Sequence, residues 1–236
     1  MVRMSLARYA IYYIPPKDSD LAIFGREWLG LDIETGKQHP LKTVRGLSKE
    51  RLLLNVADPQ PYGFHGTLKP PFSLAPNVTL NGLISATEVF AKGITPFEIP
   101  PLELVCIGKF LALSPIASSV QLENMASDCV RALDGFRAHR TAKELALYRQ
   151  AKLTVHQEQM LDNWGHPYIL EEFRFHVTLT GRIEDEKERD LAMAAAAEQC
   201  QEFIGKPLLF SDVVICRKPS PEQAMRVVKR IPFGRT

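Results

Sequence analysis

The stretch Phe64-His65-Gly66-Thr67-Leu68 recurs, with one residue changed, as Phe175-His176-Val177-Thr178-Leu179. Successive side chains of an extended strand point to opposite faces, so a histidine and a threonine two positions apart share a face. Each copy therefore presents an imidazole and a hydroxyl side by side, and turns its phenylalanine and leucine to an apolar face. We interpret both stretches as strands that the rest of the chain brings face to face.

The alternation continues beyond the two motifs. Lys69 extends the polar face of the first strand past Thr67, before Pro70-Pro71 ends the extended run. In the second strand, Thr180 and Arg182 follow Thr178 on the polar face. We therefore expect Lys69 and Arg182 to balance negative charge on a bound substrate.

A longer repeat surrounds the motifs. The interval from His65 to Cys106 is 41 positions and that from His176 to Cys216 is 40, with a predicted helix and two predicted strands in each. Solenoid repeats have periods of only about 20 to 50 residues, whereas the two motif histidines are 111 positions apart. This long period indicates duplicated lobes.

The predicted fold is therefore α+β and bilobal. Residues 1–236 form a single duplicated domain, with approximate repeats 1–115 and 116–236. Each pseudo-symmetric lobe has an antiparallel sheet packed by helices, and the motif strands face a central cleft. Residues 32–61 are mostly irregular, and whether they form a lid over the cleft stays open.

Apolar periodicity and turn residues predict the remaining elements. Helices are expected over 21–29, 48–56, 80–92, 117–133, 141–153, 154–164 and 184–203, and strands over 8–14, 97–107, 110–113, 208–216 and 225–231. A third His-x-Thr, His139-Arg140-Thr141, lies among charged residues. There we interpret Thr141 as a helix N-cap, forming a capping box with Glu144.

Composition limits the partners. A net charge of +2 and a pI near 8.3 suit a small anionic ligand and do not require a long nucleic acid, which stays an alternative. The four cysteines are far apart and are expected to be free thiols. The sequence contains no signal-peptide core and no apolar run of about 20 residues, so we expect a cytoplasmic protein without membrane contact. The oligomeric state is not defined.

Two imidazoles with two hydroxyls suit displacement at phosphorus. One histidine can activate water while the other protonates the departing oxygen, and the threonines can donate to non-bridging oxygens. Such a site requires no metal or other cofactor, and the sequence shows no metal-ligand spacing.

The paired motifs resemble the two-histidine (2H) phosphoesterase superfamily, which includes RNA and nucleotide cyclic phosphodiesterases. Three longer strings resemble the branch encoded alongside phosphonate-utilisation genes: residues 8–13, 62–72 and 173–182. The resemblance implies a bilobal fold, metal-free hydrolysis of a cyclic phosphodiester, and a small ribose-type phosphate as substrate. It also implies that the catalytic residues are His65, Thr67, His176 and Thr178.

Three tyrosines are further candidates for substrate binding. Tyr9 and Tyr13 share a strand face and either line the cleft or pack in the core. Tyr62 either stacks on a base or sugar or packs in its turn.

Three functions are compatible with these residues. The first is a cyclic phosphodiesterase for a small ribose phosphate or nucleotide, acting in phosphonate breakdown. The second is an RNA-end 2′,3′-cyclic phosphodiesterase or ligase, which a local basic rim would favour. The third is a non-catalytic protein that binds a phosphorylated ligand.

Overall fold

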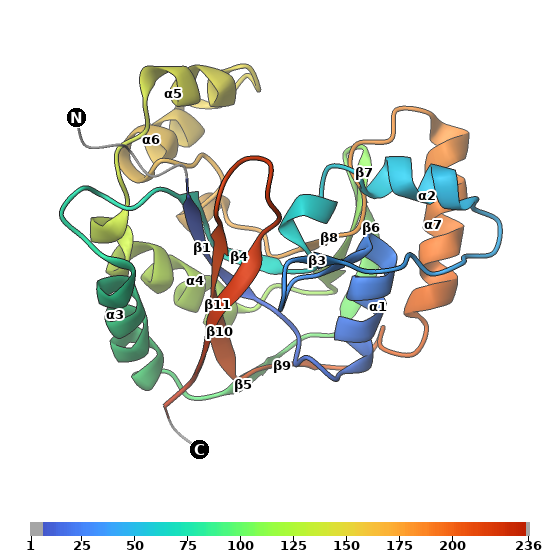
Figure 1. Ribbon diagram of the computed structural model, residues 1–236, viewed down its shortest axis with the longest axis horizontal. Helices are drawn as coiled ribbons and strands as arrows, with labels where there is room; N and C mark the ends of the chain where they lie inside the picture. The colour runs from blue at the N-terminus through green and yellow to red at the C-terminus, as the bar shows by residue number, and fades with distance from the viewer. Residues whose placement is uncertain (1–6, 235–236) are drawn as a thin grey trace.

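Seven strands form one antiparallel sheet, in the order β11-β10-β1-β4-β8-β7-β6 (Figure 1). The computed structural model describes residues 7–234. The strands of this sheet are β1 (Arg8–Tyr13), β4 (Gly66–Phe72), β6 (Leu102–Ile107), β7 (Phe110–Pro115), β8 (Val177–Thr178), β10 (Asp212–Lys218) and β11 (Arg226–Pro232). Two short pairs lie outside it: β2 (Leu31–Asp32) with β3 (Lys37–Gln38), and β5 (Phe97–Ile99) with β9 (Leu208–Phe210).

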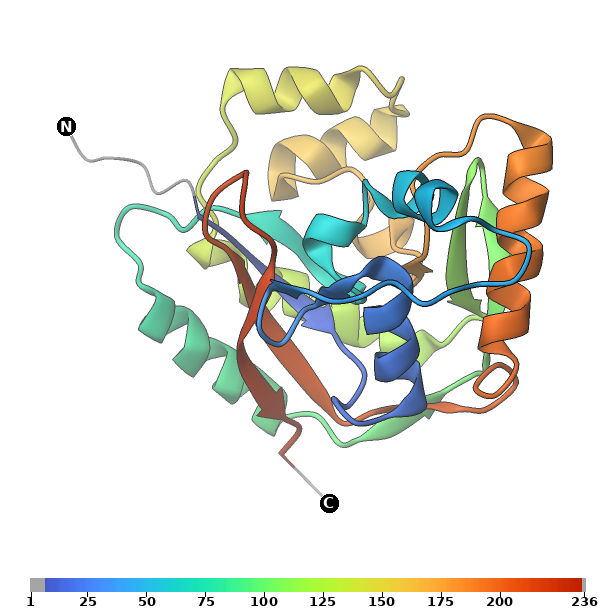
Figure 2. The same cartoon turned by 45° about the vertical axis from the view of Figure 1, so that its right-hand side comes forward.

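The helices pack against different parts of the sheet. The α-helices of the described part are α1 (Asp20–Leu29), α2 (Lys49–Val56), α3 (Leu80–Lys92), α4 (Val120–Ala132), α5 (Ala142–Arg149), α6 (Val155–Trp164) and α7 (Glu186–Cys200). Three 3-10 turns are η1 (Gln60–Tyr62), η2 (Asp134–Phe136) and η3 (Leu170–Glu172). Helix α3 packs on β10 and β11, α4 on β4, and α7 on β6, whereas α5 and α6 lie together at the top of the molecule (Figures 1 and 2).

Every predicted helix forms, with ends shifted by a few residues, because local capping signals determine where helices begin and end. Gly30 ends α1 in the left-handed conformation, with φ of 70°, which glycine adopts without strain. Thr141 and Glu144 form the predicted capping box of α5, and Thr154 and Gln157 form a second capping box at the start of α6.

The predicted α+β class is confirmed, but the prediction of a separate sheet in each half is wrong. Strand β4 pairs antiparallel with β8, so the motif strands are neighbours in one sheet and do not face each other across a gap. An unpaired edge strand leaves its backbone N–H and C=O groups without partners in the sheet. The pairing of β4 with β8 provides hydrogen-bond partners for one edge of each strand. The strand predicted around the second motif is also shorter than expected, because β8 contains only two residues.

The repeated elements occur in the predicted chain order, but the two halves of the chain interleave. The hairpin β6–β7, from the first half, extends the sheet from β8, and β10, from the second half, pairs with β1. Corresponding short strands, β5 and β9, pair with each other. Strands from the two halves of the chain therefore pair with each other in one sheet and in the pair β5–β9.

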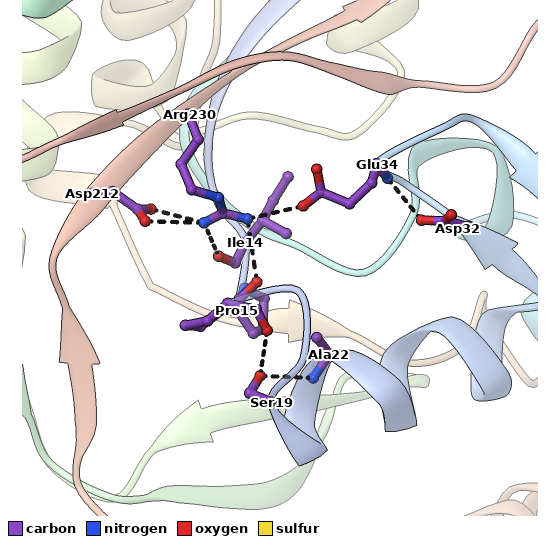
Figure 3. Close-up of polar contacts among 9 residues, drawn as sticks. Ile14, Pro15, Ser19, Ala22, Asp32, Glu34, Asp212 and Arg230 are labelled. Atoms are coloured by element: carbon purple, nitrogen blue, oxygen red, sulfur yellow. Dashed lines mark hydrogen bonds and ion pairs between the residues drawn. The ribbon is translucent and has the colours of Figure 1, made fainter.

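Arg230 on β11 ties three segments together near the end of β1 (Figure 3). Its guanidinium donates to the carbonyl oxygens of Ile14 and Pro15, at 2.8 and 3.3 Å, and to the carboxylates of Asp212 and Glu34, both at 3.0 Å. Burial raises the pKa of Asp212, and the charge of Arg230 opposes that shift. The ion pair therefore partly offsets the cost of burying this carboxylate.

Replacing Arg230 by methionine should lower the free energy of unfolding by about 3 kcal/mol, because the change leaves the Asp212 carboxylate without its counter-charge. Urea denaturation followed by circular dichroism measures this. The matched control is Lys229→Met, which removes an exposed pair with Glu88 and should cost no more than about 1 kcal/mol. Equal losses in the two variants would contradict the role given to Arg230.

Candidate active site

The register between β4 and β8 gathers the motif side chains on one face of the sheet. Gly66 pairs with Val177. Because strand side chains alternate, the antiparallel register continues on either side into two mixed pairs. These are His65 with Thr178 and Thr67 with His176, and we call the four residues the HxT quartet. Directly opposite residues have Cβ atoms about 5 Å apart and diagonal ones about 7 Å, so the two histidines flank a space of the size of a phosphate group.

The opposite face of each motif is anchored by an aromatic ring packed on a glycine. A Cβ on Gly66 would lie 2.3 Å from the ring of Phe175, and a Cβ on Gly25 of α1 would lie 2.1 Å from the ring of Phe64. Both phenylalanines are buried. The residue between histidine and threonine in the first motif is therefore glycine, because the Phe175 ring occupies the space that a Cβ at position 66 would need.

Both histidines are oriented in the same way. The Nδ1 atom of His65 lies 2.8 Å from the carbonyl oxygen of Gly63, and that of His176 lies 2.8 Å from the carbonyl oxygen of Arg174. A carbonyl oxygen only accepts hydrogen bonds, so each Nδ1 carries the proton and each Nε2 is left free to exchange one. The two motif histidines therefore have the same tautomer.

The environment of His65 favours its neutral form. Its ring stacks on the ring of Tyr12, with centroids 3.7 Å apart and planes inclined by 21°. The pKa of His65 is lowered from 6.5 to about 4, mainly by burial and to a smaller extent by the charge of nearby His176, while the hydrogen bond to Gly63 opposes the shift. The ring of Phe110 lies beside His176, with centroids 5.8 Å apart. His65 is therefore a neutral imidazole at neutral pH.

The threonines of the quartet have free hydroxyls. Thr67 and Thr178 are half-buried, and among residues 7–234 neither hydroxyl has a hydrogen-bond partner. Thr180, the next threonine on this face, is instead fully used: it accepts from the backbone N–H of Leu111 and donates to the carbonyl of Gly181. The two quartet hydroxyls are thus available to a bound oxyanion.

A large cleft of about 1150 Å³ opens over three residues of the quartet, and His176 is not among its lining residues. His65, Thr67 and Thr178 line its floor. Its charged lining is mostly basic: Arg8, Arg137, Arg140, Lys143, Arg182 and Lys218, against Asp58 and Glu144. The cleft is thus far more positive than the net charge of +2 indicates, and it suits an anion.

Two of the candidate binding residues are found at the cleft. Tyr62 and Arg182 both line the cleft. Tyr62 lies beneath the ammonium of Lys218, which is 4.5 Å from the centre of its ring. The Arg182 side chain is mostly exposed, and its guanidinium is 3.6 Å from the carboxylate of Glu184.

The expectation that Lys69 shares the polar face of its strand is wrong. Tyr12 of β1 pairs with Thr67 of β4, and Ile11, the residue before Tyr12, pairs with Lys69. The extra residue on β4, Leu68, forms a β-bulge, and the side chains of Thr67 and Lys69 therefore point to opposite faces of the sheet. Lys69 is only 2% exposed and lies under the sheet against α4. There its ammonium is 3.0 Å from the carboxylate of Asp134. Lys69 is therefore a structural residue.

Tyr9 and Tyr13 pack in the core and do not line the cleft. They share the face of Ile11, and Tyr13 stacks on Phe210 with centroids 4.4 Å apart. The residue between them, Tyr12, points to the cleft and supports His65. The alternation of side chains along a strand predicts that Tyr12 points away from Tyr9 and Tyr13. It does not predict which of the two faces packs against the helices.

The wall of the cleft comes mainly from a segment to which the sequence assigns no binding role. Residues 137–148, which include nearly all of α5, contribute the largest single group of its lining residues. From the segment 32–61, only Asp58 and Pro59 reach the cleft. His139 and Thr141 of the third His-x-Thr also line it, although Thr141 caps α5 as predicted.

Residues 7–234 contain neither a cluster of metal ligands nor a helix suited to span a membrane. No group of three or more His, Cys, Asp or Glu side chains in this part could hold a metal ion. Within the same part, none of the helices combines the length and the apolar character that a membrane crossing demands.

Comparison with known proteins assigns a family. Residues 67–226, more than half of the chain, match the family described as "Protein of unknown function (DUF1045)". The chain belongs to this family. Its match begins at Thr67 and includes the second motif.

Two curated relatives carry the name "Ribose 1,5-bisphosphate phosphokinase PhnN". The protein from Janthinobacterium sp. (strain Marseille) is 32% identical over 235 residues, which are 98% of this chain and 51% of the relative. The protein from Laribacter hongkongensis (strain HLHK9) is 28% identical over 178 residues, which are 75% of this chain and 41% of the relative. The chain thus spans about half the length of these relatives, or less.

Solved structures similar to this one include one whose description names a phosphoesterase. One is described as "Crystal structure of phosphoesterase", with a TM-score of 0.45 and 10% identity over 96% of this chain and 97% of the other. Another is E. coli LigT complexed with NADP+, with a TM-score of 0.42 and 11% identity over 97% of this chain and 98% of the other. Because these TM-scores are below 0.5, we infer function from the residues of this chain.

Replacing Gly66 by alanine should lower the free energy of unfolding by about 1–3 kcal/mol, because the new methyl group overlaps the Phe175 ring. Chemical denaturation measures this change. Gly135→Ala is the control: no atom lies within 4 Å of its added Cβ, and it should shift stability by less than about 0.5 kcal/mol. A Gly66→Ala protein as stable as the control would contradict the packing of the motif strands.

NMR titration of the histidine rings should show His65 protonating near pH 4 and not near 6.5. Because folding favours the neutral ring, His65 contributes stability above pH 6.5 that is lost as the pH falls towards 4. Tyr12→Ala should raise the pKa of His65 towards 6.5 by opening its ring to water. A wild-type midpoint at or above 6.5 would refute the buried environment of His65.

Proposed function

We propose that the protein is a phosphoesterase that hydrolyses a cyclic phosphodiester at the HxT quartet without a metal ion. The observation that supports this most strongly is the pair of histidines on adjacent strands, each with Nδ1 held by a carbonyl oxygen and Nε2 free. With the two free threonine hydroxyls between them, they suit proton transfer on both sides of one phosphate group.

In this mechanism the two histidines have different roles. His65, whose pKa is lowered by burial, accepts a proton from water through Nε2 while the water oxygen bonds to phosphorus. The bond from phosphorus to one ring oxygen of the substrate breaks, and His176 donates a proton from Nε2 to that oxygen. Thr67 and Thr178 donate hydrogen bonds to the non-bridging oxygens. The product is a phosphomonoester with a free hydroxyl.

We further propose a small ribose phosphate as the substrate, within phosphonate breakdown. The name of the two relatives refers to ribose 1,5-bisphosphate, a sugar that carries phosphomonoesters. Opening a cyclic phosphate on ribose yields a compound of this class. The resemblance of the motif strings to the phosphonate-associated branch supports the same substrate.

An RNA-end enzyme is the second candidate, because the basic lining of the cleft supplies the positive rim that a nucleic acid would need. A hydrolysis screen separates the two. Cyclic ribose phosphates and cyclic mononucleotides should be hydrolysed faster than oligoribonucleotides with 2′,3′-cyclic ends. The reverse order would favour the RNA-end function.

His65→Ala and His176→Ala should each lower kcat by about 10²–10⁴-fold, the usual range for loss of a general acid or base. The acid limb of the kcat/KM profile should lie well below pH 6.5, because His65 stays neutral to about pH 4. The control is His156→Ala, on the exposed side of α6, which should retain wild-type turnover. Undiminished hydrolysis in either quartet variant would rule out the mechanism.

A further inference from the structure

We propose that the same cleft contains a second anion subsite, formed by Arg8, Arg140 and Lys218, which binds a phosphomonoester at the far end of the substrate. This inference rests on the proposed function, because it places the cyclic phosphate at the HxT quartet. The substrate class it names is a cyclic sugar phosphate that carries a second, terminal phosphate.

The register of β1 with β10 places two cations side by side on the cleft face. Arg8 pairs with Lys218, on the same face of β1 as Tyr12, and both side chains line the cleft. Like charges directly opposite each other on a sheet are destabilising. An anion held between them would relieve this repulsion.

Arg140 completes the cluster from the wall of the cleft. Its side chain is only 8% exposed, and its guanidinium lies 4.7 Å from the ring centre of Tyr148. The guanidinium also donates to the carbonyl oxygens of Gly165 and Pro71. Arg140 is thus a cation held in place by the protein.

The acidic groups near this cluster are too few to neutralise it. Glu144 pairs with Arg8 and lies 3.7 Å from Arg140, but its carboxylate also accepts the two Thr141 hydrogen bonds of the capping box. Lys218 makes no salt bridge within residues 7–234, and its acidic neighbour Glu222 is exposed. Three cations against one carboxylate leave two positive charges. A phosphomonoester, with about −1.5 to −2 at pH 7, matches them better than a diester does.

The spacing fits a single phosphorylated sugar. Tyr12 stacks on His65, and Arg8 lies four residues earlier on the same strand, a rise of about 13 Å. The side chains reach into this interval from both ends. A pentose with phosphates at both ends fits this interval.

The test compares two substrates that differ only in the distal phosphate: adenosine 2′,3′-cyclic phosphate with a free 5′-hydroxyl and the same compound with a 5′-phosphate. Wild-type kcat/KM should be at least about 10-fold higher for the 5′-phosphorylated substrate, through a lower KM, since charged hydrogen bonds are the strong ones. Lys218→Gln should abolish most of this preference. Lys229→Gln, on the neighbouring strand and paired with Glu88, should keep it.

A second measurement does not depend on hydrolysis. Calorimetric titration should show ribose 5-phosphate binding to wild type and to Lys229→Gln about 10-fold more tightly than to Lys218→Gln, with ribose itself binding to none of them. If neither cyclic substrate is hydrolysed but this difference is found, the proposed function fails and the subsite stands. Equal wild-type kcat/KM for the two substrates would overturn the subsite. An equal loss of kcat/KM on both substrates in Lys218→Gln would do the same. Equal binding of ribose 5-phosphate to all three proteins would also contradict it.

Discussion

The antiparallel pairing of Gly66 with Val177 is the constraint on which the rest of the site depends. It places each motif histidine opposite a threonine of the other motif, with both imidazoles on the same face of the sheet, and His65 lines the cleft. The pairing is possible because glycine at position 66 leaves room for the Phe175 ring. A contact on the core side therefore determines the geometry on the functional side.

The pairing of strands from the two halves of the chain makes this junction part of a larger sheet. Strand β8 has only two residues, yet β7 continues the sheet beyond it, and β1 does the same beyond β4. The two-residue strand β8 is thus held on both sides by longer neighbours, β4 and β7. Such support is what a catalytic group needs, since displacements of about 1 Å are enough to slow proton transfer and displacement at phosphorus.

Local features of the sequence predict the elements and the quartet well. Caps such as Thr141 and Thr154 act within one helical turn, and the His-x-Thr alternation needs only the geometry of a strand. Features that depend on a partner strand are not predictable in this way. Lys69 turns to the core because of a bulge against β1, and the choice of Tyr12 over its neighbours depends on which face the helices cover.

The basic lining of the cleft also could not be predicted from the sequence. Arg8, Arg140 and Lys218 are spread over more than two hundred positions and meet through sheet register and the placement of residues 137–148. The most direct test of the account follows a cyclic ribose phosphate by ³¹P NMR, in H₂¹⁸O and with EDTA present. We predict that the cyclic ester signal converts to one phosphomonoester carrying a single ¹⁸O. An unchanged cyclic ester, or conversion only after a divalent metal is restored, would contradict the account.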